Sequence, residues 1–230
     1  MVAALFWGAL AASSLVIGAL LSLARRWPER AVGLVLAFGA GALISAVSFE
    51  LAQEGVEAGG AAAVGIGIGA GALTFYLLDG VVSKDGRSAA GTSLALGAFL
   101  DGIPEQLVLG LGLAAGQDVS VGLLAAIFIS NVPEATGSAS EMRAAHSSAA
   151  RIARLWLGVA AVCTIATGIG FAIGDSVSGA LQGGVDGFAA GALLVMLTDS
   201  MIPEARKAGR ASGIATAMGF AVAAGLSSLT

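Results

Sequence analysis

Two proline–glutamate pairs mark the residues of this chain whose types and spacing could do chemistry. Pro104-Glu105 and Pro133-Glu134 both lie inside long apolar stretches. Asp101 precedes Glu105 by four residues, so these two carboxylates share one face of a helix. A proline in a helix leaves the carbonyl four residues before it without its usual donor. Carboxylates beside freed carbonyls in a membrane interior can bind a cation or carry protons.

The second pair stands in a similar polar setting. Ser130 is four residues before Glu134 and shares its helix face, and Asn131 is adjacent. An aspartate near the bilayer centre costs roughly 2.5–3.5 kcal/mol on insertion scales, and no Lys or Arg lies in the apolar stretches to neutralise these acids. We therefore expect a cation site formed by Asp101, Glu105, Ser130, Asn131 and Glu134. Protonated acids that only hydrogen-bond neighbouring helices are the structural alternative.

Four further polar residues are candidates for lining an ion pathway: Ser45, Glu50, Thr164 and Asp199. Glu50 and Asp199 could equally be interfacial, and a serine in a membrane helix commonly bonds its own backbone. Cys163, the single cysteine, is expected to be a small core residue. One cysteine and one histidine exclude a disulfide within the chain and a His/Cys metal cluster.

Composition places these residues in a membrane protein. The chain has 230 residues, of which 57% are hydrophobic and 11% charged, whereas soluble domains average about 45–50% and about 25%. This excludes a soluble enzyme and a nucleic-acid-binding protein. About 20 apolar residues span a bilayer as a helix, and the apolar runs do not alternate as barrel strands do. We expect one all-α transmembrane domain over 1–230, with spans at 2–24, 31–51, 59–80, 90–114, 119–140, 152–174, 181–202 and 211–229.

The basic residues favour one topology for these eight spans. All eleven lie in or at the edge of odd-numbered connections: Arg25, Arg26 and Arg30; Lys84 and Arg87; Arg143, Arg151 and Arg154; Arg206, Lys207 and Arg210. The positive-inside rule makes that side cytoplasmic and predicts that both termini face outward. The outer connections carry only acids, namely Glu54, Glu57, Asp118 and Asp175, with Asp186 beside the next span.

Internal repeats connect the spans in pairs. A shift of 150 residues aligns Phe38–Ile44 with Phe188–Leu194, Ser48 with Thr198, and Glu54 with Glu204. A shift of 29 aligns Ile103-Pro104-Glu105 with Val132-Pro133-Glu134. The paired spans run in opposite directions in the expected topology, so both repeats are inverted. Inverted repeats around proline-interrupted helices are typical of secondary transporters.

The two Pro-Glu motifs and this topology resemble the ZIP (Zrt/Irt-like) family of divalent metal transporters. That family has eight spans in a 3+2+3 inverted arrangement and a span 4 motif His-Asn-x-Pro-Glu-Gly. The chain has Asp101-Gly102-Ile103-Pro104-Glu105-Gln106 there and Ser130-Asn131-Val132-Pro133-Glu134-Ala135 on span 5. The resemblance implies that Asp101, Glu105, Ser130, Asn131 and Glu134 bind metal. Both motifs lack histidine, and a span 6 glutamate ligand aligns best with Thr164.

The resemblance implies a divergent, bacterial-type member that moves zinc, manganese, iron or a similar cation into the cytoplasm by alternating access. It would be a multi-pass protein of the bacterial inner membrane, with no enzymatic activity and no cofactor beyond the transported metal. Carboxylate and carbonyl oxygens suit manganese, magnesium or calcium, whereas imidazole suits zinc. Its partners would be the cation and the lipid bilayer, and glycine-rich faces would suit a homodimer. A proton-coupled carrier of another solute and a non-transporting ZIP-like protein are the alternatives.

Overall fold

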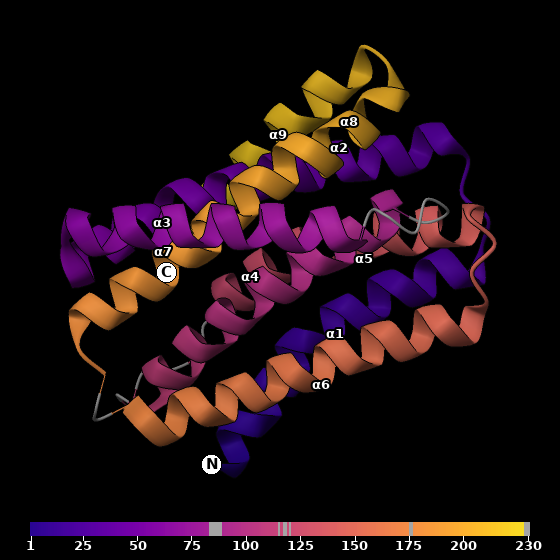
Figure 1. Cartoon of the computed structure of the whole chain (residues 1–230). Helices are drawn as coiled ribbons and strands as arrows, with labels where there is room; N and C mark the ends of the chain where they lie inside the picture. Colours follow the sequence, from indigo (N-terminus) through magenta and orange to yellow (C-terminus); the bar gives the residue numbers. More distant parts are fainter. Residues whose placement is uncertain (83–88, 115, 117–118, 120, 175–176, 228–230) are drawn as a thin grey trace.

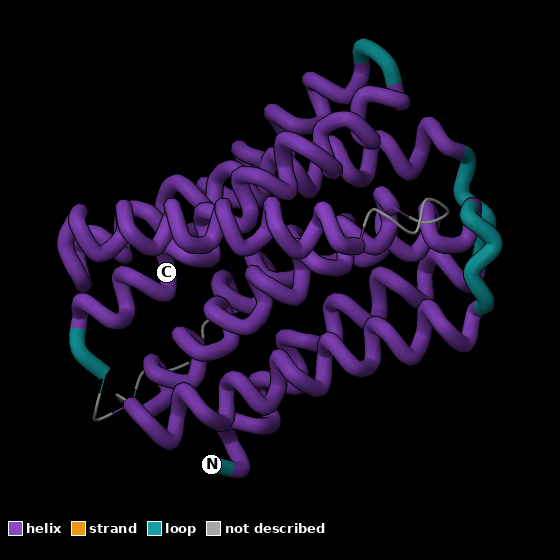
Figure 2. The backbone as a smooth tube through the Cα atoms, viewed as in Figure 1, coloured by secondary structure: helices purple, strands orange, loops and turns teal. Residues whose placement is uncertain are grey.

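The computed structural model describes residues 1–82, 89–114, 116, 119, 121–174 and 177–227. Within these ranges the chain is helical, with short turns and no strand (Figure 2). The elements are α1 Val2–Ala24, α2 Glu29–Ala46, η1 Val47–Gln53, α3 Glu54–Val82, α4 Ala89–Ala114, α5 Val121–Ala144, α6 Ala149–Ile173, α7 Gly179–Met196, η4 Leu197–Met201, α8 Ile202–Ala205, η5 Arg206–Ala208 and α9 Ala211–Ser227. The expected all-α class is confirmed.

Among the residues that the structure describes, five helical segments are long and apolar enough to cross a membrane: Val2–Ala24, Glu29–Val81, Gly91–Ala114, Ala149–Ile173 and Gly179–Ala208. The apolar α9 is shorter, at 17 residues. The 53-residue segment Glu29–Val81 contains a break at Gly60, where φ is 83°. Only glycine adopts this left-handed conformation readily, so the chain can turn there within a single residue.

The turn at Gly60 corrects one expected boundary. The ranges 31–51 and 59–80 place a connection at 52–58, whereas helical structure continues through those residues to the glycine. Acidic residues at 54 and 57 suggested a loop, but they are compatible with a helix. Four charged residues assigned to connections, Lys84, Arg87, Asp118 and Asp175, lie outside the described residues. Asp186, expected beside an outer connection, is buried within α7 with 2% of its surface exposed.

The 150-residue repeat has a local structural counterpart. Helices α2 and α7 begin 150 residues apart, and both change to π-helix at equivalent positions, Val47 and Leu197. The hydroxyl of Ser48 donates to the Ile44 carbonyl at 2.8 Å, and that of Thr198 donates to the Leu194 carbonyl at 2.7 Å. Short π-helical segments are rare and often occur at functional sites.

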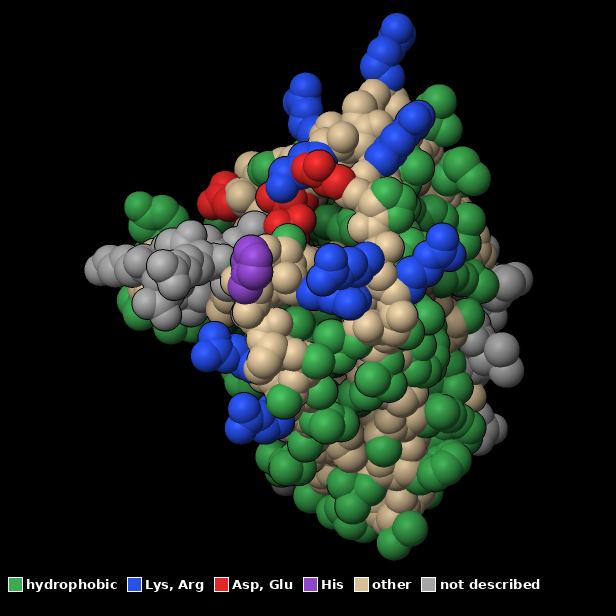
Figure 3. All heavy atoms as spheres, turned by 90° about the vertical axis from the view of Figure 1, so that its right-hand side faces the viewer, with side chains coloured by type: hydrophobic (Ala, Val, Ile, Leu, Met, Phe, Trp, Pro, Cys, Tyr) green, Lys and Arg blue, Asp and Glu red, His purple; other side chains and the backbone are tan. Residues whose placement is uncertain are grey.

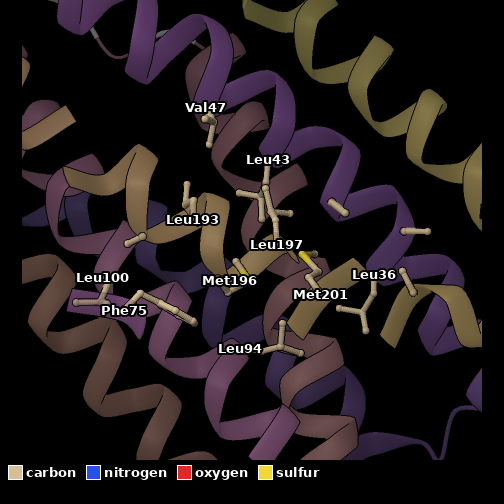
Figure 4. Close-up of a cluster of buried hydrophobic side chains, with 14 of the residues drawn as sticks. Leu36, Leu43, Val47, Phe75, Leu94, Leu100, Leu193, Met196, Leu197 and Met201 are labelled. Carbon is tan, nitrogen blue, oxygen red and sulfur yellow. The ribbon is translucent and has the colours of Figure 1, made fainter. Parts of the chain in front are cut away.

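The two larger hydrophobic clusters among the described residues pack α4 and α5 against the other helices. One is formed mainly by α2 and α7, where Leu43, Leu193 and Met196 lie close together (Figure 4). The other joins α1, α5 and α6 around the fully buried Trp156. Helix α2 packs on α9 and α5, whereas α7 packs on α3 and α4 (Figure 1). The α4–α5 pair therefore contacts both sets of helices.

Basic side chains gather at one end of the bundle. The α1–α2, α5–α6 and η5–α9 connections all lie towards the right-hand side of Figure 1, and several separate Lys and Arg side chains lie on the corresponding face in Figure 3. The N-terminus lies towards the opposite side of Figure 1. The basic residues of these three connections therefore lie at one end of the bundle, where Glu141 and Glu204 accompany them.

Candidate ion site between α4 and α5

Helices α4 and α5 bring the two Pro-Glu pairs together in the interior of the bundle. Both prolines lie inside continuous helices. Glu134 is fully buried and Asp101 is 5% exposed, whereas Glu105 is less enclosed. A Cβ on Gly97 of α4 would lie 3.3 Å from Glu134 Oε1, so the Glu134 carboxylate reaches across from α5 to α4. The acids expected at the site therefore share one region.

The electrostatic environment of this region is dominated by negative groups. Asp101, Glu105 and Glu134 interact electrostatically, and Glu50 of η1 acts on both Asp101 and Glu105. Burial removes the hydration that stabilises each carboxylate, and the other acids add repulsion. Neutralisation by protons or by a cation relieves both effects.

Some of the polar side chains at the candidate site have hydrogen-bond partners. Asn131 makes a side-chain hydrogen bond with Glu105, and its Nδ2 donates to Ser14 Oγ of α1 at 3.3 Å. Ser130 Oγ donates to the Ile127 carbonyl of its own helix at 3.0 Å. Among the described residues, no hydrogen-bond partner reaches Glu105 Oε2 or either carboxylate oxygen of Glu134. Buried polar atoms normally have partners, so these three oxygens are exceptional.

The four pathway candidates have different positions. Ser45 is fully buried on α2, and its hydroxyl has no partner in the described part of the chain. Glu50 accepts a hydrogen bond from Ser227 and lies near the buried acids. Thr164 donates to the Ala160 carbonyl of its own helix at 2.8 Å, and Asp199 is exposed on η4. The structure thus brings Glu50 towards the site but leaves Asp199 on the surface.

The acids are neighbours without forming a complete coordination shell. Among the described residues, no three His, Cys, Asp or Glu side chains are placed so that they could hold one metal ion. Asp101, Glu105 and Glu134 would have to move towards a bound cation, with Asn131 and backbone carbonyls as further oxygen donors. Such a set of oxygen ligands suits hard divalent cations.

Two polar features beside the site were not anticipated from the sequence. Cys163, expected to be a core residue, is fully buried but faces Gly102, between Asp101 and Ile103 on α4. Thr167, one turn further along α6, donates a hydrogen bond to the buried Gln106. No sequence signal marks this face, because α6 is apolar on its other sides as well.

Comparison with known proteins assigns no family and no function to the chain. No protein-family model matches the chain, and no curated protein matches it. The function is therefore inferred from the residues and geometry described above.

Proposed function

We propose that the protein transports a divalent metal cation, such as zinc, manganese or iron, into the cytoplasm through a site between α4 and α5. The observation that carries this proposal is the fully buried Glu134, whose two carboxylate oxygens have no hydrogen-bond partner among the described residues. The buried Glu105 Oε2 also has no hydrogen-bond partner among the described residues. Two neighbouring carboxylates in an apolar bundle need a positive partner, and a transported cation provides one.

The proposed arrangement is a ZIP-like fold of eight spans in a 3+2+3 inverted repeat. Three features support it: the break at Gly60, the common 150-residue register of α2 and α7, and the common change to π-helix at Val47 and Leu197. The basic end of the bundle would face the cytoplasm of a bacterial cell, with both termini outside. Relative movement of the helices packed on either side of α4 and α5 would then give alternating access.

The cation would enter from the outer side and pass from one acidic group to the next. Glu54 interacts electrostatically with Glu50, and Glu50 interacts with Asp101 and Glu105. Glu105 and Glu134 would be the central ligands, with Asp101 and Asn131 in support. No bond is made or broken in this process, so the protein would not be an enzyme.

Uptake of a metal panel into proteoliposomes tests the proposal. We expect uptake of at least one of zinc, manganese, iron, cobalt, cadmium and magnesium by the native protein, and loss of that uptake in Glu105→Gln/Glu134→Gln. A double variant at exposed acids, Glu29→Gln/Glu57→Gln, removes the same number of carboxylates and should retain the flux. Absence of uptake of every metal at several pH values would contradict the proposal.

A proton-coupled carrier of another solute is the second candidate. The electrostatic linkage of Glu54, Glu50, Asp101 and Glu105 favours it, because a series of neighbouring acids can pass protons. Flux that depends on pH but not on metal would support this alternative. A non-transporting ZIP-like protein would instead fold normally, or become more stable, when Glu105 and Glu134 are replaced by glutamine, and would show no flux at all.

A further inference from the structure

A pocket of about 590 Å³ lies at the basic end of the bundle, between the α8–η5 segment and the start of α9 (Figure 1). Two arginines, two hydroxyl residues and two glycines form most of its lining: Arg206, Arg210, Ser212, Thr216, Gly209 and Gly213. A Cβ at Gly209 or Gly213 would meet nothing within 4 Å, whereas a Cβ at Gly219 of α9 would press against the Phe38 carbonyl. The glycines of the pocket therefore leave space open, whereas Gly219 serves close helix packing.

The pocket carries positive charge that the protein does not neutralise. The neighbouring Lys207 pairs with both Glu204 and Glu141. No ion pair reaches Arg206 or Arg210 within the part of the chain that the structure describes, and both residues are exposed. Because Lys207 takes up the nearby carboxylates, the two guanidinium groups are available to an anionic ligand.

The chemistry of the lining favours a phosphate group as that anion. The two hydroxyls donate within the protein, Ser212 Oγ to the Gly209 carbonyl at 2.8 Å and Thr216 Oγ1 to the Ser212 carbonyl at 3.0 Å. The free donors of the pocket are therefore its guanidinium groups, which bind phosphate oxygens in a bidentate manner. Helix α9 begins directly after Arg210, so its positive dipole end adds to the attraction.

An apolar stripe continues from the pocket along α9. Ile214, Met218 and Val222 follow Arg210 at intervals of four residues, and all three are exposed. Residues four apart share one helix face, so a basic group stands at the end of an apolar strip. A phospholipid has the same order of a charged headgroup followed by acyl chains. A free phosphate ion would use the arginines but would make no contact with the strip.

We propose that this pocket binds the phosphate headgroup of an anionic phospholipid, whose acyl chains lie along Ile214, Met218 and Val222 of α9. Basic pockets between membrane helices are suited to such headgroups, and the inner leaflet supplies anionic lipid on the cytoplasmic side. A headgroup held by Arg206 and Arg210 would join η5 to α9 across the turn at Gly209. The proposal concerns the surface of the bundle and does not depend on which ion, if any, binds between α4 and α5.

Native mass spectrometry of the purified, full-length protein in detergent tests the proposal. The protein is titrated with phosphatidylglycerol, with zwitterionic phosphatidylcholine and with inorganic phosphate. We expect phosphatidylglycerol to bind about tenfold more tightly than phosphatidylcholine, and inorganic phosphate to bind more weakly than phosphatidylglycerol. Equal affinity for the two lipids would overturn the proposal. Inorganic phosphate that binds as tightly as phosphatidylglycerol would overturn the lipid as the ligand.

A matched pair of charge variants tests the two arginines. Arg206→Gln/Arg210→Gln should weaken phosphatidylglycerol binding about tenfold or more. Arg151→Gln/Arg154→Gln removes the same charge from exposed positions of α6 at the same end of the bundle, and it should change binding less than about threefold. An equal loss in both variants would mean that the lipid is attracted by the overall charge of this end, and would overturn a specific pocket.

A second pair of variants tests the space in the pocket. Gly213→Leu keeps both arginines but fills the opening with a side chain, so phosphatidylglycerol binding should weaken severalfold. The control is Gly158→Leu on α6, where a Cβ also meets nothing within 4 Å, and binding should be unchanged. Unchanged binding in Gly213→Leu would place the headgroup outside the pocket and overturn the proposal. This pair also tests the proposal if the arginine variants do not fold.

Discussion

Gly191 of α7 lies directly against Ile68 of α3, so that a Cβ at Gly191 would come within 2.1 Å of the Ile68 carbonyl oxygen. The equivalent position 150 residues earlier, Gly41 of α2, meets Thr216 of α9 in the same way, at 1.9 Å. In both cases the neighbouring atom is backbone, which cannot move aside as the end of a side chain can. These two glycines set the separation of two tightly packed helix pairs, as small residues do in membrane bundles.

Replacing Gly191 by alanine should therefore lower stability. Forcing a methyl group into a packed interface costs typically about 1–3 kcal/mol, and here the helices must separate to accept it. The measurement is the apparent Tm of the detergent-solubilised protein. It is obtained by heating samples and then quantifying the remaining folded protein by size-exclusion chromatography. Gly65→Ala on α3 is the control, because a Cβ at Gly65 meets nothing within 4 Å. Equal Tm values for the two variants would contradict the close contact.

The Thr167–Gln106 hydrogen bond joins α6 to α4 beside the site and should contribute to stability. Thr167→Val keeps the side-chain shape but removes the donor, leaving the buried Gln106 Oε1 without it. An unsatisfied buried acceptor costs about 1–3 kcal/mol, so the apparent Tm should fall. In the control, Thr216→Val, the hydroxyl lost bonds only its own helix at the Ser212 carbonyl, and a smaller change is expected. An equal fall in both variants would show that the interhelical bond is unimportant.

Lys207 connects η5 to α5 at the basic end of the bundle. Its Nζ lies 2.5 Å from Glu204 Oε2 and 3.9 Å from Glu141 Oε1. Partly exposed ion pairs contribute at most about 1 kcal/mol, so Lys207→Met should leave the fold intact but loosen this end. We expect faster hydrogen–deuterium exchange at 141–144 and 204–210, and the same trend in the native protein at high salt. The control Arg154→Gln should leave exchange in both segments unchanged. Unchanged exchange in Lys207→Met as well would contradict this role of Lys207.

Helix positions were predictable from the sequence because continuous apolar runs have few alternatives in a membrane. The range 90–114 was expected for α4, and the helix is Ala89–Ala114. The 150-residue register was also visible, because the segments around Phe38 and Phe188 share their pattern of small residues. The turn at Gly60 was not located, since many neighbouring residues are glycine or alanine and only one of them adopts a positive φ.

The rotation of each helix about its axis could not be predicted. On α6, the exposed Leu157 and Ile165 are as apolar as the buried Ile152 and Val159. Lipid and protein interior both select apolar side chains, so the buried face of a membrane helix is not marked by hydrophobicity. For this reason Cys163 was not distinguished as the residue of α6 that faces α4. Contacts between distant segments, such as Lys207 with Glu141, leave no local signal either.

The proposed topology predicts which residues a membrane-impermeant thiol reagent can reach from outside intact cells. Single cysteines introduced into Cys163→Ala should react at Ala58 and Ser178, which are exposed and lie near the break at Gly60 and the start of α7. Cysteines at Ser148 and Ser212, exposed or half-exposed beside the basic connections, should react only after the membrane is disrupted. Ser148 and Ser212 should be protected because the basic residues around them hold these connections on the cytoplasmic side. Labelling of Ser148→Cys in intact cells, with Ser178→Cys protected, would invert the topology and reverse the proposed direction of transport.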